Sequence, residues 1–126
     1  MDDRLSGFNT KVVVNDRTDI ALAANADGIH LKDEPLAIDR VRKYGPGEWL
    51  VGRSVHDAAG ADDVCRDGDV DYLLAGTVRS TPSKPGGKTL GFHGLKRIAN
   101  AVGTPVLAIG GLGFSDSPEA ARARAA

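Results

Sequence analysis

The sequence is poor in aromatic residues and has a single cysteine, and both shortages restrict what the chain can be. Phe, Trp and Tyr make up 5% of the 126 residues, so any core must be aliphatic. Cys65 has no second cysteine to pair with, which excludes an internal disulfide and fits a reducing compartment. No apolar run approaches the roughly 20 residues that span a bilayer, and the start MDDRLSGFN lacks the apolar segment of a signal peptide. We therefore predict a cytoplasmic protein.

An excess of charge of either sign is also missing. The 16 Lys and Arg residues nearly balance the 17 Asp and Glu residues, which leaves a net charge of -1. This balance gives no general attraction to nucleic acid or to an anionic membrane, so we expect neither as a partner. The length favours one domain, and the 16 glycines predict many tight turns or close backbone approaches.

Short apolar runs alternate with stretches of helical spacing along the whole chain. The runs lie at residues 12–14, 28–31, 49–51, 72–75 and 106–109. None of them alternates between apolar and polar residues, so we expect strands that are buried on both faces, as in a parallel sheet. Helical stripes are expected around 20–24, 36–44, 58–65 and 95–102, and from Ser117 onward. This order predicts repeated βαβ units with right-handed crossovers. An Asp precedes the strand in both NADGIHL and DVDYLLAG, which is a faint internal repeat.

Polar residues or glycines stand at the end of nearly every predicted strand. They are Asn15-Asp16, Lys32-Asp33, Ser54 and His56, Gly76-Thr77, and Gly110-Gly111. The carboxyl ends of parallel strands meet at one mouth in a (β/α) barrel, whereas an open doubly wound sheet gathers its site at one switch point. The spread of these residues over five strands favours the barrel.

Four stretches, in this order and spacing, resemble the thiamine phosphate synthase/TenI family of (β/α)8 barrels. They are VVVNDRTDIALAANADGIHL, VGRSVH, DYLLAGTVRSTPSKPGG and TPVLAIGGL. The resemblance implies an α/β fold, a partial (β/α)8 TIM barrel that supplies roughly the third to the seventh parallel strand. We expect residues 1–10 to be an unpatterned N-terminal lead and residues 11–126 to be a truncated domain of this family.

The first of these stretches carries the residues that the resemblance places at a diphosphate. It implies that Asn15 and Arg17 bind the diphosphate and that Asp16 holds it through Mg²⁺, for which carboxylate oxygen is a suitable ligand. Read from the residues alone, a turn in which the Asn and Asp side chains bond to nearby backbone explains the same sequence. Pro35 stands where the family has a second acidic Mg²⁺ ligand. The two acidic residues before it also suit the N-terminus of a helix.

The resemblance implies catalytic roles for Ser54 and Lys84. Ser54 matches a serine near the reacting pyrimidine. The motif GRSVH is more similar to the TenI thiazole tautomerases than to the synthases. The resemblance, however, aligns the catalytic histidine of the tautomerases with Thr77, and threonine is a poor general base near neutral pH. His56 fits either a polar group in the mouth or the start of a surface helix.

Two further segments suit anionic oxygen atoms. Thr81, Ser83 and Lys84 match a loop that closes on the diphosphate and the thiazole phosphate, and hydroxyls and an ammonium are suitable donors there. Gly110 and Gly111 let backbone N–H groups approach a phosphate. An ordinary basic surface loop and a tight strand-to-helix turn explain the two segments as well.

We therefore interpret the chain as a transferase of thiamine biosynthesis, whose resemblance implies that it joins an aminopyrimidinylmethyl diphosphate to a thiazole phosphate. In the family, diphosphate leaves first and the thiazole nitrogen traps the pyrimidine cation. Two alternatives stay open: a TenI-type tautomerase, and a non-catalytic phosphate-ligand binder or inactive fragment. Five strands leave two open edges, so we also expect a homo-oligomer or pairing with a complementary fragment.

Overall fold

The computed structural model describes residues 9–32, 38–83 and 85–125. Its strands are β1 Val13–Asn15, β2 Gly28–Leu31, β3 Leu50–Val55, β4 Tyr72–Ala75 and β5 Val106–Ala108. Its helices are α1 Thr18–Ala23, α2 Ile38–Tyr44, α3 Ala58–Asp67, α4 Gly91–Ala101 and α5 Ser117–Arg122, with a 3-10 turn, η2, at Phe114–Asp116. Among the described helices, none is long and apolar enough to cross a membrane.

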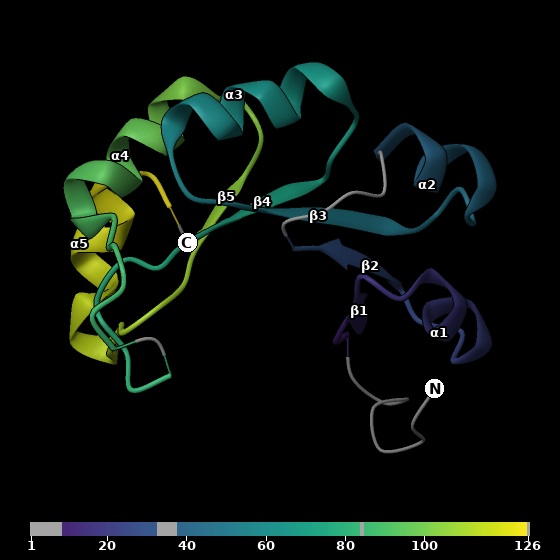
Figure 1. Cartoon of the computed structure of the whole chain (residues 1–126), viewed down its shortest axis with the longest axis horizontal. Coiled ribbons are helices and arrows are strands. Elements are labelled where there is room, and N and C mark those ends of the chain that lie inside the picture. Colours follow the sequence, from purple (N-terminus) through teal and green to yellow (C-terminus); the bar gives the residue numbers. More distant parts are fainter. Residues whose placement is uncertain (1–8, 33–37, 84, 126) are drawn as a thin grey trace.

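The five strands form one parallel sheet in their order along the chain, β1-β2-β3-β4-β5. Among the described strands, none crosses over to reverse this order, which distinguishes the sheet from a doubly wound one. Figure 1 shows the sheet curving like an arch, with the helices along its outer side. This arrangement is part of a barrel wall, as predicted.

The hydrophobic core lies between the sheet and the helices. Ile29, Leu31 and Leu73 are fully buried on the outer face of the sheet, and Leu95 and Ile98 of α4 belong to the same core. Each βα unit buries its apolar helix stripe against this face.

The inner face of the sheet is only partly covered, so the expectation of two buried faces is wrong for most strands. β2 is buried along its whole length, but in β4 half-buried and buried residues alternate. On the inner face, Leu107 of β5 is 37% exposed and Ile109, which follows β5, is 50% exposed. The short apolar runs did not reveal this difference because the inner-face residues Leu74, Leu107 and Ile109 are themselves apolar, so no period of two appears in the sequence.

The strand β3 extends beyond the apolar run that predicted it. The run ends at Val51, whereas the strand continues to Val55 through the polar sequence GRS. The extension pairs with β2 and β4 on both sides, through His30↔Gly52 and Ser54↔Leu74 among others. Hydrogen bonding to two neighbours thus outweighs the low strand propensity of these residues. It also carries Ser54 to the end of the sheet.

The repeated Asp before a strand has a structural explanation. The Asp27 carboxylate accepts from the Val12 N–H at 2.7 Å, and the Asp27 N–H donates to the Val12 carbonyl at 2.8 Å. Asp71 makes the same pair of bonds with Val51, at 2.8 Å each. Each Asp therefore fixes the neighbouring strand, and Asp71 is itself paired with Arg42 at 2.8 Å.

We expect Asp27→Ala to lower the free energy of unfolding by about 1.5 kcal/mol, because the part-buried Val12 N–H loses a charged acceptor. Urea denaturation measures the loss. Asp69→Ala is the matched control, since the Asp69 side chain is 88% exposed and lies 4.0 Å from Arg42. The control should change stability by no more than about 0.5 kcal/mol. Equal losses in the two variants would show that Asp27 acts only as a surface charge.

Candidate functional site

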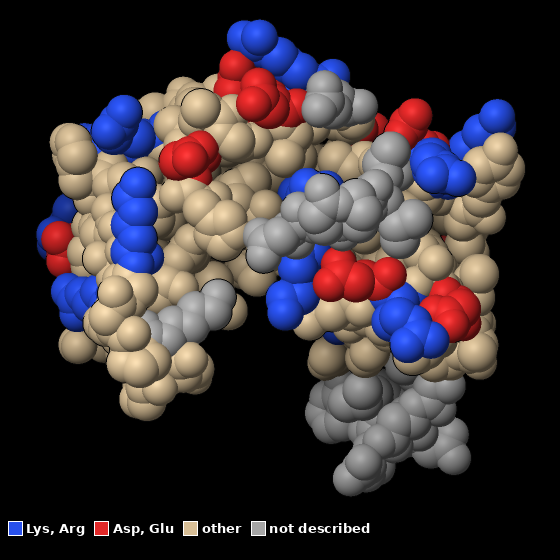
Figure 2. Space-filling model, in the orientation of Figure 1, with Lys and Arg blue, Asp and Glu red and all other residues tan. Residues whose placement is uncertain are grey.

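A cavity opens at the carboxyl ends of the strands, on the inner face of the sheet. Its volume is about 370 Å³. Figure 2 shows the molecule hollowed between its α1 side and its α5 side. The cavity is lined by Asn15, His30, Lys32, Ser54, His56, Leu74, Gly76, Thr77, Thr81, Ser83, Ile109 and Gly110. Residues from all five strands or the loops after them thus meet at one mouth.

Most of the residues singled out from the sequence meet at this cavity. Asn15, Ser54, Thr81, Ser83 and Gly110 line it. Asp16 and Gly111 directly follow two of these lining residues. The catalytic role predicted for Lys84, and the metal-site argument about Pro35 and the two acidic residues before it, lie outside the described residues.

Asp16 sits in a strained turn at the end of β1. Its backbone has a positive φ of 57°, which is uncommon for a residue other than glycine. One carboxylate oxygen accepts from the Lys32 N–H at 2.8 Å, and the Asp16 N–H donates to the His30 carbonyl at 2.9 Å. These bonds join the ends of β1 and β2. The turn reading of Asp16 is therefore physically sound, and it holds the carboxylate against the backbone of Lys32, a residue that lines the cavity.

The Arg17 side chain is engaged elsewhere and is not one of the cavity-lining groups. Its guanidinium makes two hydrogen bonds to the Asp19 carboxylate, at 2.9 and 2.7 Å. This hydrogen-bonded pair lowers the pKa of Asp19 to about 2 and raises that of Arg17. Both side chains are more than 60% exposed, at 63% and 66%, so the pair contributes little to stability. A diphosphate role for Arg17 stays a prediction.

Sequence reasoning missed His30, the buried polar residue of β2. It is 4% exposed, and its ring lies between Tyr72 and Ser54. The Nδ1 atom is 3.0 Å from the Tyr72 hydroxyl, and Nε2 is 2.8 Å from the Ser54 hydroxyl. Burial lowers the pKa of His30 and raises the pKa of Tyr72, which favours the neutral form of both. The available signal was a histidine inside an otherwise apolar strand.

His56 belongs to the cavity rather than to the outer surface of α3. It lines the mouth, and its Nδ1–H donates to the Gly76 carbonyl at 2.8 Å. Thr77, which stands where a tautomerase would have its catalytic histidine, lines the cavity too. Lys32 is a second residue that sequence reasoning left out of the site. It is an exposed cation on the cavity wall.

The two glycines after β5 are required by the way two loops pack. Gly110 and Gly111 have positive φ values of 106° and 64°. A Cβ atom on Gly110 would lie 2.5 Å from the Thr77 side chain, and one on Gly111 would lie 2.7 Å from the Ser80 carbonyl oxygen. The tight-turn reading therefore explains both residues. The same lack of side chains leaves the Gly110 backbone open to the cavity.

The described residues offer a metal ion one carboxylate near the cavity, so most of its ligands would come from a bound phosphate group and water. Among the described residues, no three His, Cys, Asp or Glu side chains gather as a metal cluster. Asp16 is one carboxylate, with one oxygen already accepting from Lys32 N–H. Mg²⁺ commonly binds through one or two carboxylates together with phosphate oxygens and water. Asp16 therefore suits an ion that arrives with a diphosphate.

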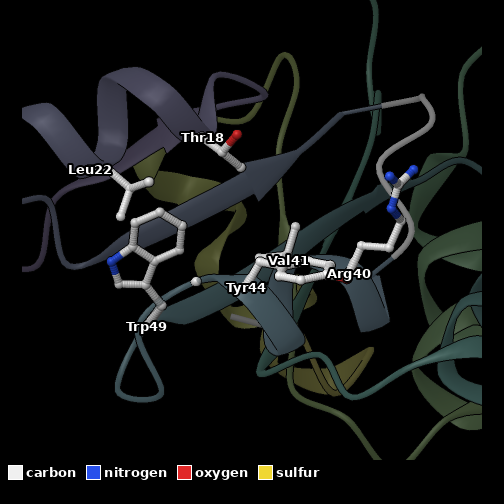
Figure 3. A pocket seen from close by; sticks show the side chains of 7 residues that line it. Thr18, Leu22, Arg40, Val41, Tyr44 and Trp49 are labelled. Atoms are coloured by element: carbon white, nitrogen blue, oxygen red, sulfur yellow. The ribbon is translucent and has the colours of Figure 1, made fainter.

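A second cavity, of about 220 Å³, lies between α1 and α2 on the outer side of the sheet. Leu22 lies beside the indole ring of Trp49 there, and Val41 and Tyr44 come from α2 (Figure 3). The lining is mostly apolar, with Thr18 and Arg40 as its polar members. It lacks the convergent polar groups of the first cavity, so we interpret it as a packing gap between two barrel helices.

The chain matches one protein family over nearly its full length. The family described as thiamine monophosphate synthase, TMP-TENI, matches residues 3–126. The thiamine-phosphate synthase of Saccharopolyspora erythraea is 38% identical over 116 residues, which cover 90% of this chain and 52% of that protein. A probable thiamine biosynthetic bifunctional enzyme of Oryza sativa is 42% identical over 107 residues, or 84% of this chain and 19% of that protein.

Solved structures agree with the sequence matches. Thiamine phosphate pyrophosphorylase from Pyrococcus furiosus superposes with a TM-score of 0.81 at 30% identity, covering 96% of this chain and 57% of that one. FabK from Thermotoga maritima has a TM-score of 0.73 at 18% identity, over 94% of this chain and 40% of that one, which shows a shared fold alone. The chain thus spans about half the length of the thiamine-phosphate synthases that it matches.

Proposed function

Because the chain belongs to the thiamine monophosphate synthase family, we propose that its cavity binds the substrates of thiamine phosphate formation. The observation that carries this proposal is the convergence of hydroxyl, amide and backbone groups from five strands on one cavity. The proposed substrates are an aminopyrimidinylmethyl diphosphate and a thiazole phosphate. The reaction breaks the carbon–oxygen bond to diphosphate and forms a carbon–nitrogen bond to the thiazole.

The leaving diphosphate must be stabilised as its negative charge develops. Asn15 and the hydroxyls of Thr81 and Ser83 are the donors we propose for its oxygen atoms, and Arg17 and Lys84 are the cations we propose to balance its charge. Gly110 and Gly111 offer backbone N–H groups to a phosphate. Ser54, which lines the cavity, would face the pyrimidine. Lys84 would assist the departure of diphosphate.

Asp16 would hold the Mg²⁺ that accompanies the diphosphate. When bound, the ion would neutralise the charge of the leaving group. The strained backbone of Asp16 and its bond to Lys32 N–H support this role, because they hold the carboxylate in a fixed position next to a residue that lines the cavity. Lys32 adds a positive charge on the same wall, which suits an anionic ligand whether or not the metal is present.

The two alternative functions receive less support from the cavity. A tautomerase needs a general base, and Thr77 stands at the position where that histidine would be. A phosphate-ligand binder without activity would use the same hydroxyls and glycines. Binding of diphosphate without formation of thiamine phosphate, in the presence of both substrates, would favour that alternative.

Asp16→Asn tests the proposal without disturbing the turn. An asparagine side chain keeps an acceptor for the Lys32 N–H and tolerates the positive φ, but it removes the charge that binds a metal. We expect Mg²⁺ to raise the affinity of the parent for diphosphate. In the presence of Mg²⁺, the variant should bind diphosphate roughly tenfold more weakly than the parent, a difference of about 1.4 kcal/mol. Calorimetric titration of diphosphate with and without Mg²⁺ measures both values.

Asp63→Asn is the matched control, because Asp63 is an exposed carboxylate of α3, on the outer side of the sheet. It should leave the effect of Mg²⁺ unchanged. If Asp16→Asn and the parent respond to Mg²⁺ alike, Asp16 is a turn residue only.

Lys84→Ala should weaken diphosphate binding with or without Mg²⁺, and more at low salt, where screening of the lost charge is weakest.

A further inference from the structure

Three strands place one row of residues across the inner face of the sheet. His30 of β2 pairs in register with Gly52 of β3, and Gly52 pairs with Tyr72 of β4. A Cβ atom at Gly52 would lie 2.0 Å from the Tyr72 ring. Because Gly52 has no side chain, the Tyr72 ring crosses β3 and stacks on His30, with ring centroids 5.6 Å apart and planes inclined by 20°.

This row ends in a chain of hydrogen bonds that leads to the cavity. The Tyr72 hydroxyl meets His30 Nδ1 at 3.0 Å, and His30 Nε2 meets the Ser54 hydroxyl at 2.8 Å. Ser54 lines the cavity, whereas Tyr72 does not. A neutral imidazole has one N–H and one acceptor nitrogen, so the two bonds must run in the same direction. Either both protons point toward Ser54, or both point toward Tyr72.

Hydrogen-bond satisfaction distinguishes the two directions. If His30 Nδ1–H donated to Tyr72, the phenol proton would have no acceptor among the described residues, since His30 is the hydrogen-bond partner that Tyr72 has there. Because Tyr72 is half-buried, this direction leaves its phenol proton without the protein partner that the other direction supplies. In the other direction Tyr72 donates to Nδ1 and Nε2–H donates to Ser54. The Ser54 proton then points to the cavity, where ligand or solvent can accept it.

We propose that Tyr72 and His30 act as positioning residues that fix the Ser54 hydroxyl as a hydrogen-bond donor into the cavity. The site then selects a ligand with an acceptor atom at that point, such as an aromatic ring nitrogen or a phosphate oxygen. This selectivity rests on the proposed function, because it takes the cavity to be the substrate site. Which ring nitrogen of His30 carries the proton is a property of the protein alone and does not depend on the proposed function.

The tautomer of His30 is measurable in the ligand-free protein. Two-bond ¹H–¹⁵N spectra of the ¹⁵N-labelled full chain distinguish Nε2–H from Nδ1–H by their cross-peak patterns. We expect His30 to be uniformly Nε2–H, while the exposed His93 serves as an internal comparison without such a constraint. An Nδ1–H tautomer, an equal mixture or an imidazolium at His30 would overturn the proposal, whatever the activity of the chain.

Two variants test whether Tyr72 sets the tautomer. Tyr72→Phe removes the hydroxyl and keeps the ring, so His30 should become a mixture of both tautomers. Gly52→Ala removes no hydrogen-bonding group but forces the Tyr72 ring aside, and it should have the same effect. A uniform Nε2–H signal that persists in both variants assigns the tautomer to another cause and refutes the role of Tyr72. Should either variant fail to fold, the parent spectrum still decides the orientation.

Ligand binding tests the selectivity with two probes, 4-aminopyrimidine and inorganic diphosphate. Ser54→Ala should weaken one of them about fivefold, whereas Ser54→Thr, which keeps the hydroxyl, should weaken it less. A loss for the pyrimidine identifies a ring nitrogen as the acceptor, and a loss for diphosphate identifies a phosphate oxygen. No loss for either probe overturns the selectivity. If the parent binds neither probe, the proposed function fails, and the NMR result decides the orientation separately.

Discussion

Replacing Gly28 with alanine should lower the free energy of unfolding by at least about 3 kcal/mol. Gly28 begins β2 and pairs with both β1 and β3. A Cβ atom there would lie 2.0 Å from the Leu50 carbonyl oxygen and 2.8 Å from the Leu50 carbonyl carbon and nitrogen. These are backbone atoms of a neighbouring strand, so no side-chain rotation relieves the clash. The strands β2 and β3 must separate, which disrupts hydrogen bonds and core packing together.

The expected loss is large beside the total stability of a domain, which is about 5–15 kcal/mol. Gly47→Ala is the matched control, because no atom lies within 4 Å of a Cβ built there and its φ is not positive. The control should be neutral or slightly stabilising, since alanine restricts the unfolded chain. Thermal and urea unfolding of both variants provide the measurement. Similar stability of the two variants would mean that the start of β2 yields more easily than its contacts indicate.

The sequence predicted the order of the elements because that order follows from local patterns. The apolar runs and helical stripes identified the five strands and their helices, with ends displaced by a few residues. The polar groups after each strand predicted that Asn15, Ser54 and Gly110 would share one mouth, and they line one cavity. Parallel strands make this inference reliable, since their carboxyl ends must lie on the same side.

Other features depend on contacts between strands, and no local pattern carries them. The polar end of β3 is a strand because it pairs on both sides, and the role of Gly52 is visible only when its register partners are known. Sequence reasoning missed His30 for the same reason, because its hydrogen-bond partners Ser54 and Tyr72 lie 24 and 42 residues away in the sequence. Arg17 stands next to Asp16, yet its side chain turns to Asp19. The position of Arg17 next to Asp16 in the sequence therefore did not predict where its side chain points.

The exposed inner face leads to the second prediction, that the chain as given associates through this face. Among the described residues, β1 and β5 are the edges of the sheet and have no further strand partner. Unpaired edges expose N–H and C=O groups that favour pairing with another chain. On the inner face, Leu107 of β5 and Ile109 directly after it are 37% and 50% exposed. Burying about 400 Å² of such apolar surface yields roughly 10 kcal/mol, of which association consumes a large part.

We therefore expect concentration-dependent oligomers with a dissociation constant in about the micromolar range, measured by sedimentation velocity. Leu107→Lys places a charge on the inner face at the β5 edge and should shift the chain to monomer. Ile20→Lys is the matched control, because Ile20 is 44% exposed but belongs to α1 on the outer side of the sheet. The control should associate like the parent. A parent chain that stays monomeric at high concentration, and is as stable as an ordinary domain, would show that the open inner face tolerates water. In that case the edges and the cavity would be available to ligands in the single chain, and substrate binding would not depend on association.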